Sequence, residues 1–438
     1  MAFSGTHPSI EDVRPRPVQN SFGEGARPRP WRVIHACEFA RDVLPVVEGQ
    51  VTSGMKPYIV TPQGEGSAEL YLSGRRQDQP RSLSLLRSWQ DVRNWRKSIL
   101  DCDPENSADI VHTHCFAAGM AAVRNIGGVV YDLRACIEEL AMSAGQCEHG
   151  SWMGRSFRVA EQFVLARAAA VIVHSSGMKD AAQQRGALTE SIFLIPDPLP
   201  IGEDSPLRAQ PLEQNFLQHR FGIPAGSVSF LVPQFATPAH TELSAEQKAV
   251  LESFALVRAE NPRFSLLLDA VTTVAMREAL EEFAAHLKIR EDIVFIDLAD
   301  SASAWQSADV ILATGELPAD AVVARSANEI CLNAMLHGKT LLAADVPRNR
   351  DVSPEGRGCL WFEDKNPRDL AFRISFLQRN PSFRAALAAA GRFHVLETRS
   401  TAAIGRQYRE AYNYAFGRKR FTGPSTGVAT LQPAANWG

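Results

Sequence analysis

The chain has 438 residues, of which 45% are hydrophobic and 22% are charged, and its formal net charge at pH 7 is −3. This length is too great for one ordinary hydrophobic core, so two domains are expected. The near balance of charge gives no reason to expect a nucleic-acid partner, and the lack of any run of 18 apolar residues argues against a membrane span.

The first 30 residues are expected to be a disordered tail. They combine several proline–arginine pairs with glycine and serine, and such a composition does not bury a core. They also lack the apolar segment that a secretory signal requires. The last residues, 418–438, have a similar composition and are expected to be a second disordered tail.

Short β-rich runs alternate with amphipathic runs through the first half, which predicts a parallel α/β sheet. The expected strands are residues 32–36, 58–61, 110–112, 129–132, 171–174 and 192–195, and the expected helices include 85–100 and 157–168. A proline-rich stretch with few apolar residues follows. It predicts a linker over residues 201–226.

The second half repeats the alternation. Strands are expected at residues 229–232, 264–268, 293–296, 310–313 and 341–344, and helices at 245–260, 275–287, 326–337 and 367–379. The sequence therefore predicts two consecutive doubly wound domains, in which ligands bind at the carboxyl ends of the strands. Neither G-x-G-x-x-G nor G-x-x-x-x-G-K-[ST] is present, which weakens the dinucleotide-binding and P-loop interpretations.

Cysteine usage indicates a reducing, cytoplasmic compartment rather than a disulfide framework. The seven cysteines are an odd number and include no C-x-x-C pair. His112, His114 and Cys115 are the potential metal ligands that lie closest together. No second cluster lies at zinc spacing, so no metal cofactor is expected.

Six segments, taken in order, resemble the family-4 retaining glycosyltransferases of the GT-B fold. They are ADIVHTHCFAAG (108–119), ARAAAVIVHSSGMKDAAQQRG (166–186), IFLIPDPLP (192–200), SADVILA (307–313), LNAMLHGKTLLAADVP (332–347) and the stretch 356–392. The resemblance implies two Rossmann-like domains that face each other across a cleft. The acceptor domain is expected at 31–200, the nucleotide-sugar domain at 227–400, and a helix at 401–417 that returns to the first domain.

The resemblance also indicates where the donor site should lie. In the family, one helix carries two glutamates eight positions apart, which hold the sugar and the ribose. The segment NAMLHGKTLLA places Asn333 at the second of these positions and Arg325 at the first. Asparagine can still hydrogen-bond a diol, whereas arginine accepts no hydrogen bond. In an alternative register, Glu329 is the acidic residue on the same helix face.

The start of that helix is a second candidate for donor binding. The N–H groups at a helix start can hold a diphosphate, and here they belong to Ser326, Ala327 and Asn328. Ser326 could instead cap the helix. Arg348 and Arg350 could also bind phosphate, but a solvated basic rim is the simpler interpretation of each of them.

Other family features are changed. EFARDVLP (38–45) replaces the glycine pair after the first strand, and LVPQFATPAH (231–240) lacks the cations that neutralise the diphosphate. Gln234 and His240 lie near the positions of those missing cations, while His114 keeps the position of the family's donor-contacting histidine. Compensation of the leaving diphosphate normally contributes strongly to catalysis.

A basic amphipathic stretch, Leu85–Leu100, carries tryptophans beside several arginines. Such a helix can lie on an anionic membrane, but packing of its apolar stripe on the first sheet is the simpler interpretation.

The resemblance leads to one main hypothesis and two alternatives. The first is a cytoplasmic glycosyltransferase that uses a nucleotide-sugar and a saccharide or lipid-linked acceptor, with an altered donor site and without a metal. The second is a catalytically inactive protein of the same fold that acts as a partner of an active glycosyltransferase. A sugar-nucleotide epimerase of similar fold fits less well, because the segments after Gly356 resemble the transferases more closely.

Overall fold

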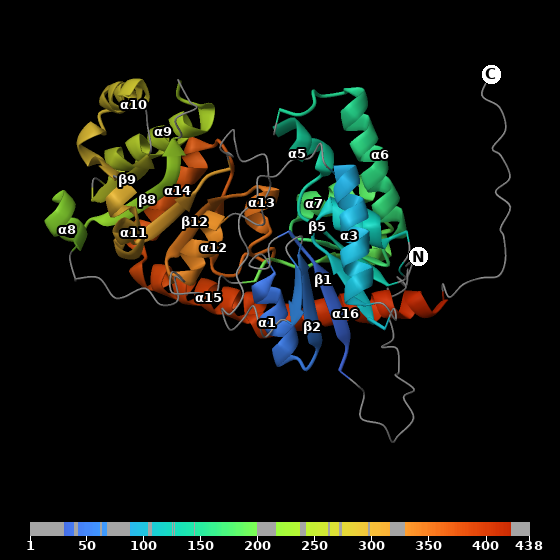
Figure 1. Cartoon of the computed structure of the whole chain (residues 1–438). Coiled ribbons are helices and arrows are strands. Elements are labelled where there is room, and N and C mark those ends of the chain that lie inside the picture. Colours follow the sequence, from blue (N-terminus) through green and yellow to red (C-terminus); the bar gives the residue numbers. More distant parts are fainter. Residues whose placement is uncertain are drawn as a thin grey trace, which may run out of the picture. The chain divides into compact units, whose positions relative to one another are not determined.

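The computed structural model contains two α/β sheets (Figure 1). The structure describes residues 30–38, 43–61, 64–67, 88–103, 107–124, 126, 128–143, 145–198, 216–236, 242–261, 263–270, 274–296, 298–315 and 329–421. Among the helices of these residues, none is long and apolar enough to cross a membrane.

The first sheet has seven strands in the order β3-β2-β1-β4-β5-β6-β7. They are β1 (Arg32–Ala36), β2 (Lys56–Thr61), β3 (Gly64–Ser67), β4 (Ile110–Thr113), β5 (Val129–Leu133), β6 (Ala170–Val173) and β7 (Ile192–Leu194). All neighbours are parallel except β2 and β3, which pair antiparallel. The inner strands are apolar and buried, as expected for a sheet with helices on both faces.

The helices that follow these strands in the chain are α1 (Leu44–Thr52), α3 (Ser88–Cys102), α4 (Phe116–Ala122), α5 (Ile137–Ser143), α6 (Trp152–Arg167) and α7 (Ser176–Gln184), with a 3₁₀ turn at Thr189–Ser191. In α3, Val92, Trp95 and Ile99 are buried in the core beside the sheet. The apolar stripe of this helix therefore packs on its own domain over these three residues. Leu85, Leu86 and the side chain of Trp89 lie outside the described residues.

The second sheet has six strands in the order β10-β9-β8-β11-β12-β13, and all of its pairs are parallel. They are β8 (Val228–Ala236), β9 (Phe264–Ala270), β10 (Ile293–Ile296), β11 (Val310–Ala313), β12 (Thr340–Ala344) and β13 (Cys359–Phe362). The strand order reverses direction after β10, as in doubly wound folds. The two sheets confirm the predicted α/β architecture.

The helices of this half are α8 (Phe216–Phe221), α9 (Ala245–Glu260), α10 (Val274–His286), α11 (Leu298–Ser307), α12 (Glu329–Leu336), α13 (Pro347–Arg350), α14 (Pro367–Arg379) and α15 (Pro381–Arg399), with a 3₁₀ turn at Arg290–Asp292. Helix α8 lies within the expected linker, and its Leu217 is buried in the core of this half. Helix α12 ends at a left-handed glycine, Gly338 (φ 62°), which directs the chain into β12.

The last helix, α16 (Thr401–Phe421; red in Figure 1), packs on the first sheet rather than the second. Its buried side chains join the core formed by β1, β4 and β6: Ile404, Tyr408, Ala411, Tyr412 and Ala415. Two glycines let α16 approach α1 closely. A Cβ on Gly49 would lie 2.4 Å from the carbonyl oxygen of Thr401, and one on Gly405 would lie 2.7 Å from that of Gly49. Backbone contact at this crossing requires residues without side chains.

A second close approach joins α15 to the turn before β13. Gly358 has φ 76°, and a Cβ on it would lie 2.0 Å from the Cα of Gly391 in α15. A methyl group does not fit at Gly358, whereas at Gly391 it would lie 3.1 Å from the carbonyl oxygen of Gly358, a tight contact.

Glu161 of α6 is a buried carboxyl group in the first domain. Its side chain is inaccessible to solvent, its Oε1 accepts the N–H of Ile137 at 3.1 Å, and its Oε2 lies 3.3 Å from Nε of Arg185. Burial raises the pKa of Glu161 to about 7, even though this N–H group and Arg185 favour the charged form.

This raised pKa makes the stability of the chain depend on pH. Between pH 4.5 and about 7 the folded chain retains a proton on Glu161 that the unfolded chain has lost. The stabilisation is therefore complete below pH 4.5 and is lost as the pH rises to about 7. At about 1.4 kcal/mol per pH unit, the loss is about 3 kcal/mol.

Glu161→Gln does not titrate, so its free energy of unfolding relative to wild type should rise by about 3 kcal/mol between pH 4.5 and 7. Urea unfolding at a series of pH values measures this difference. The exposed Glu190→Gln serves as the control and should show a constant difference. A constant difference for Glu161→Gln as well would contradict the raised pKa.

Candidate functional site

Polar side chains collect where four neighbouring strands of the first sheet end. His35 is the fourth residue of β1, His112 and His114 stand at the end of β4, Asp132 lies in β5, and His174 follows β6. Because the carboxyl ends of parallel strands lie at one edge of a sheet, these side chains meet. With Gln50 of α1 and Tyr412 of α16 they form what we call the polar cluster.

Asp132 is the hub of the polar cluster. Its Oδ2 accepts hydrogen bonds from Nδ1 of His114 at 2.8 Å and Nε of Arg134 at 3.1 Å, while Oδ1 accepts one from Nε2 of His174 at 2.7 Å. The Asp132 side chain is inaccessible to solvent. A buried carboxylate with three charge-assisted or imidazole donors fixes the orientation of all of them.

A chain of close polar contacts extends from this hub to the last helix. Nε2 of His114 lies 2.9 Å from Nδ1 of His35, and Nε2 of His35 lies 2.9 Å from Oε1 of Gln50. Gln50 then donates from Nε2 to the hydroxyl of Tyr412 at 2.8 Å, and the same hydroxyl lies 2.8 Å from Nδ1 of His112. Helix α16 thus completes the cluster from 300 residues away in sequence.

Burial and charge act in opposite directions on these groups. Burial alone would raise the pKa of Asp132, but the charges of Arg134 and His174 and the imidazole hydrogen bonds hold that pKa well below its usual range. Burial lowers the pKa of His114, and it lowers that of His35 to about 3. The pKa of His174 is raised, because Asp132 and Asp197 outweigh the effect of burial.

The cluster can therefore present an oriented, neutral imidazole. The carboxylate of Asp132 accepts only, so Nδ1 of His114 carries the hydrogen and Nε2 carries the lone pair. Such a nitrogen can accept a hydrogen bond from a hydroxyl group or bind a metal ion. The side chain of His114 is only 4% exposed.

The structure describes only some of the residues that were expected to form the donor site in the second domain. Four of them lie outside the described residues: Arg325, Ser326, Ala327 and Asn328. Glu329 begins α12 and is exposed, whereas Asn333, one turn later, is half-buried. Gln234 lies in β8, but its side chain is not among the described parts. Within the described residues, no hydrogen bond or ion pair joins Glu329 or Asn333 to the polar cluster.

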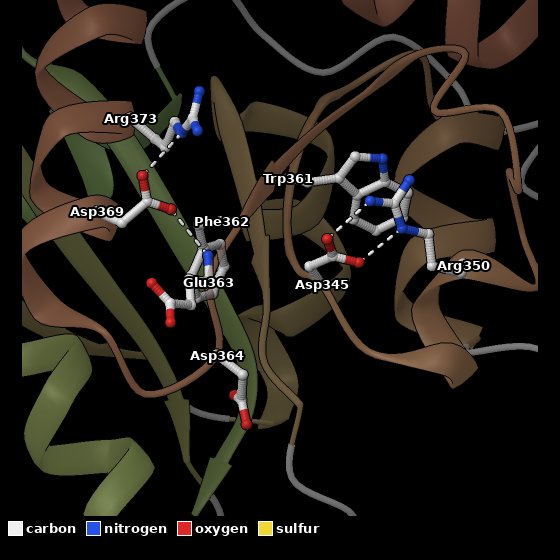
Figure 2. Close-up of a pocket in the computed structure, with 8 residues that line it drawn as sticks. All are labelled: Asp345, Arg350, Trp361, Phe362, Glu363, Asp364, Asp369 and Arg373. Carbon is white, nitrogen blue, oxygen red and sulfur yellow. Dashed lines mark hydrogen bonds and ion pairs between the residues drawn. The ribbon is translucent and has the colours of Figure 1, made fainter.

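A cavity of about 650 Å³ opens in the second domain where β12 and β13 end (Figure 2). Arg350 forms a two-pronged ion pair with Asp345, at 2.6 and 2.7 Å, and its guanidinium carbon lies 4.4 Å from the ring centre of Trp361. Figure 2 shows a separate pair of Arg373 and Asp369, whose closest atoms are 3.2 Å apart.

Carboxylates outnumber cations around this cavity. Glu363 and Asp364 line it as well, and both arginines already face an aspartate. An anionic diphosphate is repelled by such an excess of negative charge. The cavity is therefore a poor candidate for phosphate binding, and the guanidinium group of Arg350 already forms an ion pair with Asp345.

Of the polar cluster, the sequence predicted a functional role only for His114, and it named His112 only as a potential metal ligand that was then discounted. A usable signal was nonetheless present: His35, Asp132 and His174 are polar residues at the ends of otherwise apolar strands. Strand ends are where doubly wound sheets bind ligands. Gln50 and Tyr412 gave no such signal, because each stands inside an ordinary helix.

Comparison with known families agrees with this architecture. Residues 39–198 match the family model described as a glycosyl transferase 4-like domain. The matched range contains all of the polar cluster except His35 and Tyr412. No curated protein matches the sequence.

Three solved structures share the fold. A glycosyltransferase from Rickettsia africae is 14% identical, with 88% of this chain and 98% of that chain covered and a TM-score of 0.59. HepE of Anabaena in complex with UDP-glucose is 15% identical, with 87% of this chain and 99% of that chain covered and a TM-score of 0.53. Sucrose-phosphate synthase of Thermosynechococcus elongatus is 15% identical, with 89% of this chain and 100% of that chain covered and a TM-score of 0.50. At such identities the likeness concerns the fold alone. The chain thus has the α/β fold of GT-B glycosyltransferases and resembles the glycosyl transferase 4-like family over residues 39–198.

Proposed function

We propose that this chain is a retaining glycosyltransferase that uses a nucleotide-sugar and transfers the sugar to a saccharide or lipid-linked acceptor in glycoconjugate biosynthesis. The observation that supports this most directly is the setting of His114, within the range that matches the glycosyl transferase 4-like model. Asp132 holds the imidazole ring of His114 at a strand end, with a lone pair on Nε2 of that ring. HepE of Anabaena, which shares the fold, is in complex with UDP-glucose.

The donor's nucleotide is assigned to the second domain, along α12 and the residues that precede it. There Asn333 would hydrogen-bond the ribose diol through its amide, which has both a donor and an acceptor. Arg325 and the N–H groups of Ser326, Ala327 and Asn328 would face the diphosphate. No metal takes part in this transfer as proposed.

A second candidate is a catalytically inactive partner of an active glycosyltransferase. The enclosure of His114 favours it, since Nε2 of this side chain faces His35 at 2.9 Å and the side chain is 4% exposed. A donor could reach that nitrogen only if His35 or His114 moved. Asparagine at position 333, where the resemblance implies glutamate, favours the same candidate.

Calorimetric titration of the full chain with UDP, GDP and ADP, followed by turnover with the matching sugar nucleotides, separates the two candidates. Binding of one nucleotide together with release of nucleoside diphosphate supports the enzyme. Failure of all three nucleotides to bind would overturn it and leave the inactive partner.

Three substitutions on α12 decide between the alternative registers. If Asn333 holds the ribose, Asn333→Ala should weaken nucleotide binding by about tenfold to hundredfold, the effect of one or two lost hydrogen bonds. Asn333→Glu should also weaken it, because a new negative charge would lie beside a ligand that carries phosphate. Glu329→Gln is the matched control one turn away and should bind as wild type does. Loss of binding in Glu329→Gln but not in Asn333→Ala would establish the other register.

A further inference from the structure

Three imidazoles of the polar cluster lie against one another at the ends of β1 and β4. His35 and His112 are register partners on these parallel strands, and His114 follows two residues later. Their ring centres are 4.0 to 5.2 Å apart. One ring nitrogen of each lies within 4.8 Å of one ring nitrogen of both others.

The remaining nitrogen of each ring is held from outside this group. Nε2 of His35 lies 2.9 Å from Oε1 of Gln50, Nδ1 of His112 lies 2.8 Å from the hydroxyl of Tyr412, and Nδ1 of His114 lies 2.8 Å from Asp132. Metal-binding histidines typically use such an outer partner, which fixes the ring and the tautomer.

These partners leave two lone pairs facing each other. The amide oxygen of Gln50 and the carboxylate of Asp132 only accept hydrogen bonds, so the hydrogens sit on Nε2 of His35 and Nδ1 of His114. The lone pairs are then on Nδ1 of His35 and Nε2 of His114, which are 2.9 Å apart. Two acceptors at this distance repel each other unless a positive charge lies between them.

The third ring supplies an independent observation. His112 is inaccessible to solvent, and no described residue offers its Nε2 a hydrogen-bond partner. An unpaired buried polar atom costs stability and is rare in folded proteins. A metal ion that accepted this nitrogen as a ligand would remove that cost.

We propose that His35, His112 and His114 bind one divalent transition-metal ion of the zinc type, through Nδ1 of the first and Nε2 of the other two. Imidazole nitrogen suits zinc, cobalt and nickel. Tetrahedral zinc with Zn–N bonds of about 2.0–2.1 Å places two ligand nitrogens about 3.4 Å apart. The observed 2.9 Å and the upper limit of 4.8 Å bracket this separation, so small ring movements would complete the site.

The main competing arrangement needs no metal. If the amide of Gln50 is turned over, its nitrogen donates to His35, and Nδ1 of His35 then donates to Nε2 of His114. That arrangement satisfies these two rings but still leaves Nε2 of His112 without a partner. A shared proton between His35 and His114 would likewise leave Nε2 of His112 without a hydrogen-bond partner among the described residues.

The test uses the full chain, stripped with a chelator and titrated with Co²⁺ and then Zn²⁺. We expect one ion per chain and the visible absorption of a tetrahedral Co²⁺ with nitrogen ligands, which Zn²⁺ abolishes. His35→Asn and His112→Asn should weaken Co²⁺ binding at least a hundredfold. His149→Asn, which changes an exposed histidine, is the control for adventitious binding and should bind as wild type does.

Histidine ring ¹⁵N resonances of wild type provide a second readout that does not depend on the folding of any variant. Stoichiometric Zn²⁺ should shift three of the eleven histidines. Absence of Co²⁺ and Zn²⁺ binding at micromolar concentration, or shifts confined to exposed histidines, would overturn the proposal. Both readouts measure metal binding alone and are scored separately from turnover. An ion on Nε2 of His114 would occupy the lone pair that the proposed transfer uses, so metal binding would favour the inactive partner over the transferase.

Discussion

Asp132→Asn is expected to lower the free energy of unfolding by about 3–5 kcal/mol, the usual cost of removing one partner from a buried ion pair. The carboxylate receives hydrogen bonds from His114, His174 and Arg134 while inaccessible to solvent. An asparagine amide carries no charge, and its nitrogen would face a donor on one side. The substitution therefore leaves a buried hydrogen-bond donor without an acceptor and removes one of the two carboxylates that face Arg134, the other being Asp197 at 3.4 Å.

Urea unfolding at pH 7 in the presence of a chelator measures this loss, with the exposed Asp180→Asn as a control that should change little. Arg134→Gln supplies a double-mutant cycle. In the Arg134→Gln background, Asp132→Asn should lower the free energy of unfolding by less, because the positive charge of Arg134 is no longer present. A loss below about 1 kcal/mol in the single variant would mean that Asp132 is not the hub of the cluster.

Gly358→Ala is expected to lower the free energy of unfolding by about 2–5 kcal/mol. A left-handed backbone costs a residue with a side chain about 1–2 kcal/mol, and overpacking adds about 1–3 kcal/mol. Both costs apply here, since φ is 76° and the added Cβ would lie 2.0 Å from the Cα of Gly391. Relief would require α15 to move away from β13.

Gly54→Ala is the matched control, because Gly54 has φ 77° and an added Cβ there would have no atom within 4 Å. It should show the backbone cost alone, about 1–2 kcal/mol. Thermal or urea unfolding of both variants gives the comparison. Equal losses in the two variants would show that α15 yields easily and that the close contact is unimportant.

Several elements of the fold were predictable because their signals are local. Helix α9 begins after Ser244, which forms a capping box with Gln247, and α14 begins with Asn366 and Pro367. Caps and prolines act over a few residues, so these helices could be bounded from sequence. The short strand β3 was missed, because its residues, Gly64–Ser67, carry no apolar alternation.

The polar cluster depended on information that a single sequence does not carry. The pairing of His35 with His112 follows from the register of two parallel strands whose sequence separation is long. The contact of Tyr412 with His112 follows from the docking of α16 across 300 residues. Neither parallel register nor helix docking is encoded by local propensity. His114 was identified because its segment resembles a known family.

The docking of α16 on the first sheet sets an order for folding during synthesis. A ribosome adds residue 401 only after every strand of both sheets has been made. Until then, the apolar side chains of Val33, Ile110 and Ile172 lack the helix that covers them, and Gln50 lacks its hydroxyl partner. The first domain therefore emerges early but reaches its native core only after the second has been translated. In the interval it exposes a surface of the kind that nascent-chain chaperones bind.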